Sequence, residues 1–111
     1  MVDRIYEMSL KYGTPMYIYD GHQIDRNYEI LKSTTDEEVD IFYSIKANPN
    51  GSICRQFHRL GAGIEVASGG ELQMALHAGF EPKDIIFAGP GKNEQDLELA
   101  IKSNIYCITV E

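Results

Sequence analysis

The sequence predicts an α/β fold in which parallel strands alternate with crossover helices. Short apolar runs of strand length recur along residues 39–111. Each run is followed by a turn and then by apolar residues at helical spacing. Capping residues and glycines mark where the helices begin and end. Because parallel strands with continuous apolar runs are usually buried on both sides, this pattern predicts a sheet covered on both faces.

Two further helices are expected before this repeat. The first is an amphipathic helix over about residues 3–11. The segment 16–20, MYIYD, is expected to be a short strand, and residues 34–38 a solvated loop. Asp20 and Gln23 have the spacing of a capping box for the second helix. Its inner face would carry Ile24, Tyr28 and Leu31.

The repeat itself predicts four strands and three helices in the order βαβαβαβ. The strands are expected at residues 39–45, 63–68, 84–89 and 105–111. Ser68 and Glu71 form a capping box in which a serine is followed three residues later by a glutamate. The expected N-caps are Ser52, Ser68 and Asn93, and the expected C-terminal ends are Gly61, Gly79 and Asn104. The inner stripes would be Ile53, Phe57 and Leu60; Leu72, Ala75 and Leu76; and Leu97, Ala100 and Ile101.

Two architectures fit this order of elements. One is an open, doubly wound sheet, and the other is part of a (β/α)8 barrel. A complete barrel takes about 250 residues. The 111 residues of this chain therefore hold at most about half of one. The pattern of residues alone leaves both architectures open.

Composition and charge exclude several classes of function. The net charge of -7 argues against nucleic-acid or anionic-membrane partners, which call for clustered lysine and arginine. No apolar run approaches the roughly 18 residues of a membrane span, and the acid-bearing N-terminus does not resemble a signal peptide. Two cysteines form neither a disulfide framework nor a metal site, which predicts a reduced, cytoplasmic setting. The three histidines are expected on helix surfaces.

Chemistry in either architecture gathers at the carboxyl ends of the strands. Four features are expected there: Lys46, residues 65–68, residues 89–92 and Glu111. Lys46 directly follows an apolar strand. If it is partly desolvated, its pKa falls and a neutral amine becomes available to form a Schiff base with an aldehyde. The alternative is that Lys46 extends into solvent.

Glu65 lies between apolar residues in a very short strand. A carboxylate there needs a cation or a hydrogen-bond donor, and Lys46 would serve; alternatively, Glu65 faces water at a frayed strand end. The loop 89–92, GPGK, would cradle an anion with its backbone N–H groups or form a plain βα turn. It lacks the Walker spacing, and no G-x-G-x-x-G occurs in the chain, so the plain turn is favoured.

Three motifs resemble those of the fold-type III pyridoxal-phosphate decarboxylases, the family of diaminopimelate, ornithine and arginine decarboxylases. They are YSIKAN at 43–48, IEVASGGEL at 64–72 and IIFAGPGKNEQDLELAI at 85–101. They follow the order and spacing of that family, and the opening TPMYIYD is similar to its lead-in. The resemblance covers about residue 12 to the end. It is strongest to the diaminopimelate-like branch, including enzymes of antibiotic and siderophore pathways and an acyl-carrier-protein-linked glutamyl decarboxylase.

This resemblance implies the N-terminal half of a TIM barrel of the alanine-racemase-like type. It also implies pyridoxal phosphate as cofactor, decarboxylation of an amino acid and a homodimer. Lys46 would be the Schiff-base lysine, and Glu65 and Glu71 would stabilise its ammonium form when it is released. Other residues that would surround the cofactor are Tyr43, Ser44, Asn48 and Ser68.

The chain departs from the family in two respects. Glu65 stands where the family more often has aspartate, and the chain stops after ITVE. Residues 1–111 are therefore expected to be a partial barrel domain without the later parts of the family's active site, and inactive alone. Two other functions stay open: a non-catalytic α/β module that binds a ligand or a partner, and a racemase with the same barrel and lysine.

Overall fold

The computed structural model describes residues 2–110, so Glu111 lies outside the described residues. The helices are α1 (Val2–Tyr12), α2 (Gly21–Ser33), α3 (Gly51–Arg59), α4 (Gly69–Ala78) and α5 (Glu94–Lys102). The strands are β1 (Phe42–Ser44), β2 (Gly63–Val66), β3 (Ile85–Phe87) and β4 (Cys107–Ile108). Two 3-10 turns, η1 (Ile45–Ala47) and η2 (Pro82–Asp84), complete the regular structure.

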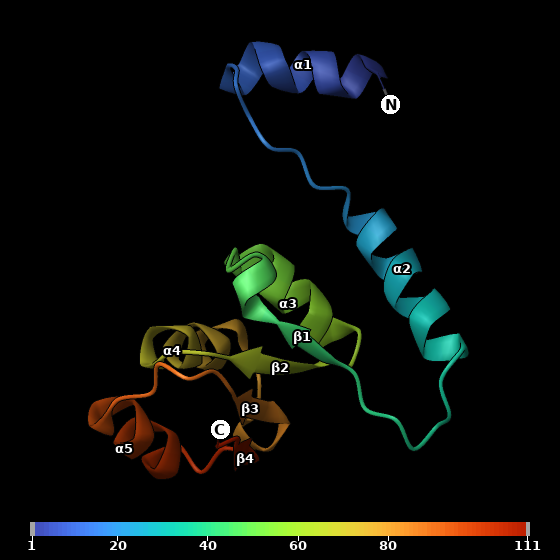
Figure 1. The fold of residues 1–111 in the computed structure, drawn as a ribbon. Helices are drawn as coiled ribbons and strands as arrows, with labels where there is room; N and C mark the ends of the chain where they lie inside the picture. Colours follow the sequence, from blue (N-terminus) through green and yellow to red (C-terminus); the bar gives the residue numbers. More distant parts are fainter. Residues whose placement is uncertain (1, 111) are drawn as a thin grey trace.

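The four strands form one parallel sheet in the order β1-β2-β3-β4, and α3, α4 and α5 connect them (Figure 1). Each strand thus pairs with the next strand along the chain. A doubly wound sheet reverses its strand order at a switch point, and the four strands of the described residues show no reversal. The structure therefore decides between the two architectures in favour of the singly wound order of a (β/α)8 barrel.

Among residues 2–110, helices cover one face of the sheet, which differs from the expected cover on both faces. The residues facing α3, α4 and α5 are fully buried: Ile64, Val66, Ile85 and Phe87. On the opposite face, Phe42, Glu65 and Ile86 are only half-buried. Crossovers of the same hand between strands in sequential order place every helix on the same side. The half-buried side is hereafter called the open face.

Helix ends were predicted well wherever the signal is local. The Ser68 hydroxyl accepts a hydrogen bond from the Glu71 N–H, and Asn93 forms a complete capping box with Asp96. Gly79 ends α4 with a φ of 103°, a left-handed conformation that favours glycine. These contacts confirm the expected starts of α4 and α5 and the expected end of α4.

Three predicted helix signals differ in detail. Asn50, not Ser52, caps α3, because the Asn50 carboxamide oxygen accepts from the Ser52 N–H at 2.9 Å. Asp20 caps α2 as expected by accepting from the His22 N–H. Gln23 does not complete a capping box, since its side-chain amide donates a hydrogen bond to Asn27 Oδ1 at 2.8 Å. Ser103 is the C-cap of α5, and Asn104 follows it with a φ of 55°.

The expected strand at 16–20 is absent. This segment is extended but unpaired, and Tyr17 is 93% exposed. Tyrosine and isoleucine favour a strand only where a neighbouring strand supplies hydrogen bonds and packing. The expected strand at 39–45 is likewise reduced to Phe42–Ser44, because the chain enters η1 at Ile45.

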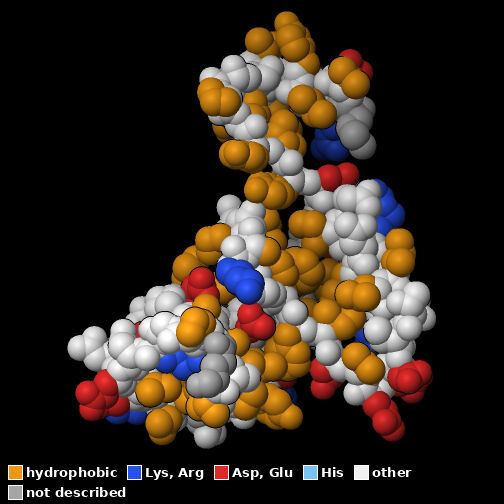
Figure 2. All heavy atoms as spheres, viewed as in Figure 1, with side chains coloured by type: hydrophobic (Ala, Val, Ile, Leu, Met, Phe, Trp, Pro, Cys, Tyr) orange, Lys and Arg blue, Asp and Glu red, His pale blue; other side chains and the backbone are white. Residues whose placement is uncertain are grey.

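Helix α1 stands apart from the sheet at the end of the extended segment (Figure 1). It forms as expected, and it buries none of its side chains. Hydrophobic side chains cover much of its surface (Figure 2). Its exposed hydrophobic residues are Val2, Ile5, Tyr6, Met8, Leu10 and Tyr12. Within residues 2–110, no helix has the length and hydropathy that crossing a membrane requires.

Candidate functional site

Lys46 lies in η1, directly beyond the carboxyl end of β1. The preceding residue, Ile45, is fully buried and anchors the turn, while the Lys46 side chain is exposed. The hypothesis of a partly desolvated Lys46 is therefore not supported, and the alternative of an amine in solvent describes the structure. The backbone of Lys46 is fixed by its neighbours, and its amine is accessible.

Tyr43 holds the turn from the helix-covered side of the sheet. Its ring stacks on Phe57 of α3 with centroids 4.0 Å apart, and its hydroxyl donates to the Asn48 carbonyl at 3.0 Å. The Asn48 side chain accepts from the Asn50 N–H at 3.0 Å. Both residues were expected to surround the cofactor. In the structure they support the turn that carries Lys46, and their contact with the cofactor stays a prediction.

Replacing Tyr43 with phenylalanine should cost about 1 kcal/mol of unfolding free energy at pH 7, because it removes one hydrogen bond and keeps the ring stack. Burial raises the pKa of Tyr43, and the neighbouring Cys54 adds a smaller increase. The contribution of protonated Tyr43 to the free energy of unfolding is therefore complete below the unfolded-state pKa of about 10. It is lost as the pH rises through the higher pKa of the folded state.

Urea unfolding of the chain at pH 7 and above pH 10 measures both effects. The decline in stability on the alkaline side should be shallower in Tyr43→Phe than in the parent chain. Tyr106→Phe is the matched control, because Tyr106 is 66% exposed. Equal stability of Tyr43→Phe and the parent at both pH values would contradict the assigned role of the hydroxyl.

Glu65 lies on the open face beside Ser44 of the neighbouring strand. The two residues are register partners, and the Ser44 hydroxyl donates to Glu65 Oε1 at 3.0 Å. Both side chains are half-buried. The expectation that Glu65 needs a hydrogen-bond partner is met by Ser44 and not by Lys46. Among residues 2–110, ion pairs join Lys83 to Glu81 and Lys102 to Glu98, and neither includes Lys46.

The start of α4 places Ser68 and Glu71 just beyond the carboxyl end of β2. Glu71 Oε2 accepts from the Ala67 N–H at 2.7 Å, one residue before the position that a standard capping box would use. Its other oxygen, Oε1, accepts no hydrogen bond within the described part of the chain. The carboxylate of Glu71 is thus held by the backbone at one oxygen and available at the other.

The loop 89–92 behaves as a plain turn. The Lys92 ammonium group donates to the Gly89 carbonyl of its own loop, and it lies 5.8 Å from the centroid of the Phe87 ring. The histidines lie on exposed helix surfaces, as expected: His22, His58 and His77. No group of three or more metal-ligating side chains occurs among residues 2–110.

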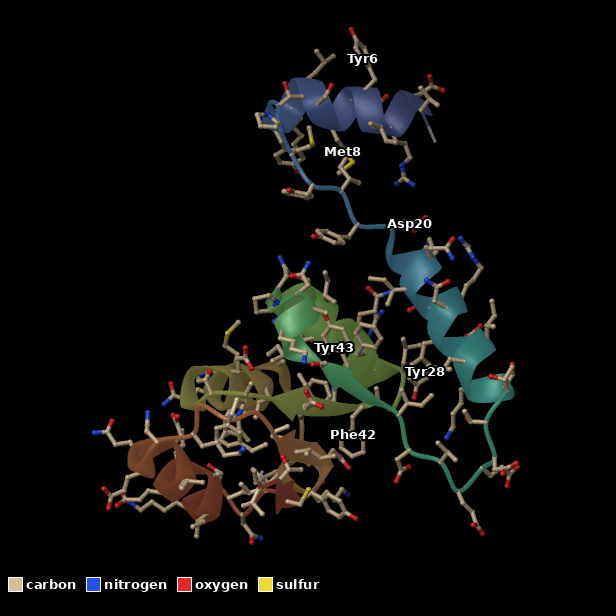
Figure 3. All side chains as sticks on the ribbon, in the orientation of Figure 1. Tyr6, Met8, Asp20, Tyr28, Phe42 and Tyr43 are labelled. Atoms are coloured by element: carbon tan, nitrogen blue, oxygen red, sulfur yellow. The ribbon has the colours of Figure 1, made fainter. Side chains whose placement is uncertain are left out.

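A hydrophobic groove of about 320 Å³ lies between α2 and the edge of β1. Tyr28 extends from α2 toward β1 (Figure 3), and its ring meets Phe57 edge-on at 6.4 Å between centroids. Leu31, Ile41 and Phe42 also line the groove. The groove borders the unpaired edge of the sheet, and Ser44, the hydrogen-bond partner of Glu65, also lines it.

Sequence reasoning missed Asp96. Its carboxylate accepts from the Gly69 N–H at 2.9 Å and also from the Asn93 N–H. The spacing of Asn93 and Asp96 at the start of a helix indicates a local cap. Nothing in that spacing indicates a second contact 27 residues away.

Comparison with known proteins gives a consistent set of similarities. The family profile described as "Pyridoxal-dependent decarboxylase, pyridoxal binding domain" matches residues 21–111. An L-glutamyl-[BtrI acyl-carrier protein] decarboxylase of Niallia circulans is 45% identical over 104 residues, which are 94% of this chain and 24% of that protein. A diaminopimelate decarboxylase of Vibrio cholerae is 36% identical over 106 residues, which are 95% of this chain and 25% of that protein.

Solved structures agree with the sequence similarities. A crystal structure of a protein from Aquifex aeolicus superimposes with a TM-score of 0.92 at 36% identity, covering 96% of this chain and 27% of that one. The diaminopimelate decarboxylase of Helicobacter pylori, complexed with L-lysine, superimposes with a TM-score of 0.86 at 34% identity, covering 94% of this chain and 27% of that one. The chain therefore spans about a quarter of the length of the proteins it matches.

Proposed function

The chain belongs to the pyridoxal-dependent decarboxylases and matches their pyridoxal-binding domain; from this premise we propose that it supplies the lysine-bearing part of an amino-acid decarboxylase. In this proposal residues 1–111 form part of a barrel domain, and the active enzyme is a homodimer. The observation that carries the proposal is the exposed Lys46 amine on a fixed turn, at the same strand ends as the Ser44–Glu65 pair.

The residues at this edge of the sheet fit pyridoxal phosphate. Lys46 offers a primary amine for the cofactor aldehyde, and its exposure leaves room for the covalent bond. When bound, the cofactor supplies an electron sink for the electron pair that remains after CO2 departs. No helix of residues 2–110 covers the open face beyond Lys46, so a planar ring can approach the strand ends from that side.

Glu65 and Glu71 would control the proton on Lys46. Whenever Lys46 is not bonded to the cofactor, its amine would carry a proton at neutral pH. A carboxylate close by stabilises the resulting ammonium group and reduces its return to the cofactor. Ser44 fixes the orientation of Glu65 by donating to Oε1, which leaves Oε2 to accept from Lys46. Glu71 offers its Oε1 in the same way.

Two groups of relatives support two candidate substrates. The diaminopimelate decarboxylases favour a free amino acid, and the relative from Niallia circulans favours an amino acid attached to a carrier protein. Decarboxylation assays of a full-length protein with meso-diaminopimelate, glutamate and a glutamyl thioester separate these substrates. CO2 release from one of them supports a decarboxylase. Exchange of the α-proton without CO2 release would indicate a racemase, and cofactor-independent binding alone would indicate a non-catalytic module.

Replacing Glu65 with glutamine should lower turnover by about 100-fold in a full-length enzyme, a typical contribution of proton transfer to catalysis. The melting temperature should be unchanged or raised. A neutral amide costs less to bury than a carboxylate without an ion-pair partner, and the amide oxygen still accepts from the Ser44 hydroxyl. Steady-state kinetics and thermal melting measure both quantities.

Glu98→Gln is the matched control, because Glu98 is an exposed glutamate paired with Lys102 on α5. It should leave turnover as in the parent. A large loss of stability in Glu65→Gln at unchanged turnover would make Glu65 a structural residue.

A further inference from the structure

The carboxylate of Asp96 joins the starts of two helices. Oδ1 accepts from the N–H of Gly69, the first residue of α4, at 2.9 Å. Oδ2 accepts from the N–H of Asn93, the N-cap of α5, at 3.3 Å. Helix starts leave N–H groups without partners inside the helix, and a carboxylate is the strongest side-chain acceptor for them. One side chain therefore ties the loop after β2 to the loop after β3.

Gly69 is the residue that permits this contact. A Cβ atom at Gly69 would lie 2.5 Å from Asp96 Oδ1 and 3.5 Å from Leu99 Cδ2. The first distance is too short for any real contact, so a side chain at this position would displace the carboxylate. The neighbouring Gly70 differs, since a Cβ atom there meets only the Ser68 hydroxyl at 3.9 Å, an ordinary contact.

The Asp96–Gly69 hydrogen bond lies next to the candidate catalytic groups. Gly69 immediately follows Ser68, whose hydroxyl caps α4, and it is two residues before Glu71. Glu71 in turn bonds the Ala67 N–H, so residues 67–71 form one hydrogen-bonded unit at the carboxyl end of β2. Fixing Gly69 therefore fixes the direction in which the Glu71 carboxylate points.

We propose that Asp96 is a positioning residue. By accepting a hydrogen bond from the Gly69 N–H, it keeps the Glu71 carboxylate in its position relative to Lys46 and Glu65. This inference rests on the proposed function for its effect on the reaction, but its structural part can be tested without cofactor. Displacement of a reacting group by about 1 Å can lower a rate by about 100-fold. Loss of the Asp96 carboxylate should therefore lower turnover more than loss of the α5 cap alone does.

The experiment compares two alanine variants in a full-length protein. Asp96→Ala removes both contacts. Asn93→Ala is the matched control, because it weakens the start of α5 and leaves the Asp96–Gly69 contact in place. Hydrogen–deuterium exchange is measured on the cofactor-free protein, and kcat and KM on the loaded enzyme. Both variants should lower the melting temperature.

Only Asp96→Ala should speed amide exchange at residues 67–71 and lower kcat by about tenfold or more, as expected for a misplaced group. Asp96→Glu, which retains the carboxylate, should recover part of the lost kcat. Equal exchange at 67–71 and equal kcat in the two alanine variants would show that Asp96 is only a cap of α5, and would overturn the inference.

Alanine variants of two adjacent glycines, Gly69 and Gly70, give a second test, which remains available if Asp96→Ala does not fold. Alanine is a better helix former than glycine, so both Gly69→Ala and Gly70→Ala gain local helix propensity. Gly70→Ala should match the parent in exchange and kcat, while Gly69→Ala should lower kcat and speed exchange at 67–71. Identical behaviour of the two variants would also overturn the inference. Failure of the proposed function looks different: either the parent would form no covalent bond to pyridoxal phosphate, or Lys46→Ala would keep that bond, whatever the exchange data show.

Discussion

Replacing Lys46 with alanine in a full-length enzyme should abolish covalent attachment of pyridoxal phosphate and lower turnover about a thousandfold or more. On the proposed function, attachment to Lys46 would hold the cofactor in place before the substrate arrives, and such prior positioning is worth large factors in rate. Lys46→Arg keeps the positive charge but should fail equally, because a guanidinium group does not form the bond.

Covalent mapping identifies the lysine directly. Borohydride reduction of the loaded enzyme, followed by proteolysis and mass spectrometry, should place the phosphopyridoxyl mass on the peptide containing Lys46. Lys92→Ala is the control, since the Lys92 ammonium group is turned toward the Gly89 carbonyl of its own loop. Modification of Lys92 or of the exposed Lys83, in place of Lys46, would refute the assignment.

The second large effect concerns these 111 residues by themselves. They should release no CO2 from any candidate amino acid, and they should associate in solution. Four strands form the described sheet, whereas closure of the barrel takes eight. The outer edges of β1 and β4 have no partner strand among residues 2–110, and unpaired edges favour association with another chain. Phe42 and Ile86 on the open face add apolar surface.

Size-exclusion chromatography and CO2 release assays on the purified chain test this expectation. Ile41→Lys places a charge in the hydrophobic groove beside the edge of β1 and should lower the associated fraction. Ile101→Lys is the control, because Ile101 is 70% exposed on α5 and does not belong to the inner stripe in which it was expected. Substantial turnover by a monomer would show that the partial-barrel interpretation is wrong.

The sequence predicts the parts of this fold that depend on neighbours along the chain. The caps at Ser68 and Asn93 and the end of α4 at Gly79 need only three or four adjacent residues, and all three are confirmed. Strand lengths and the covered face depend on distant partners. The segment 16–20 has strand-forming residues but no neighbouring strand, and the side of the sheet that each helix covers is set by strand order.

The same distinction applies to the candidate site. The motif that contains Lys46 and the apolar surroundings of Glu65 are visible in the sequence. The partner of Glu65 is not, because choosing Ser44 over Lys46 requires the register between β1 and β2. The faces of Tyr43 and Ser44 are not visible either: alternation along β1 puts the two residues on opposite faces, and the sequence does not say which face is covered.

The sequential strand order also determines how this part of the chain can assemble. Each strand pairs with the one made just before it, so every new βα unit finds its docking surface already present. The contacts span short distances along the chain, which favours rapid folding. During synthesis, β1 and β2 can pair before β4 has left the ribosome, and the helix-covered core grows one unit at a time. The edge of the most recent strand then serves as the template for the next one.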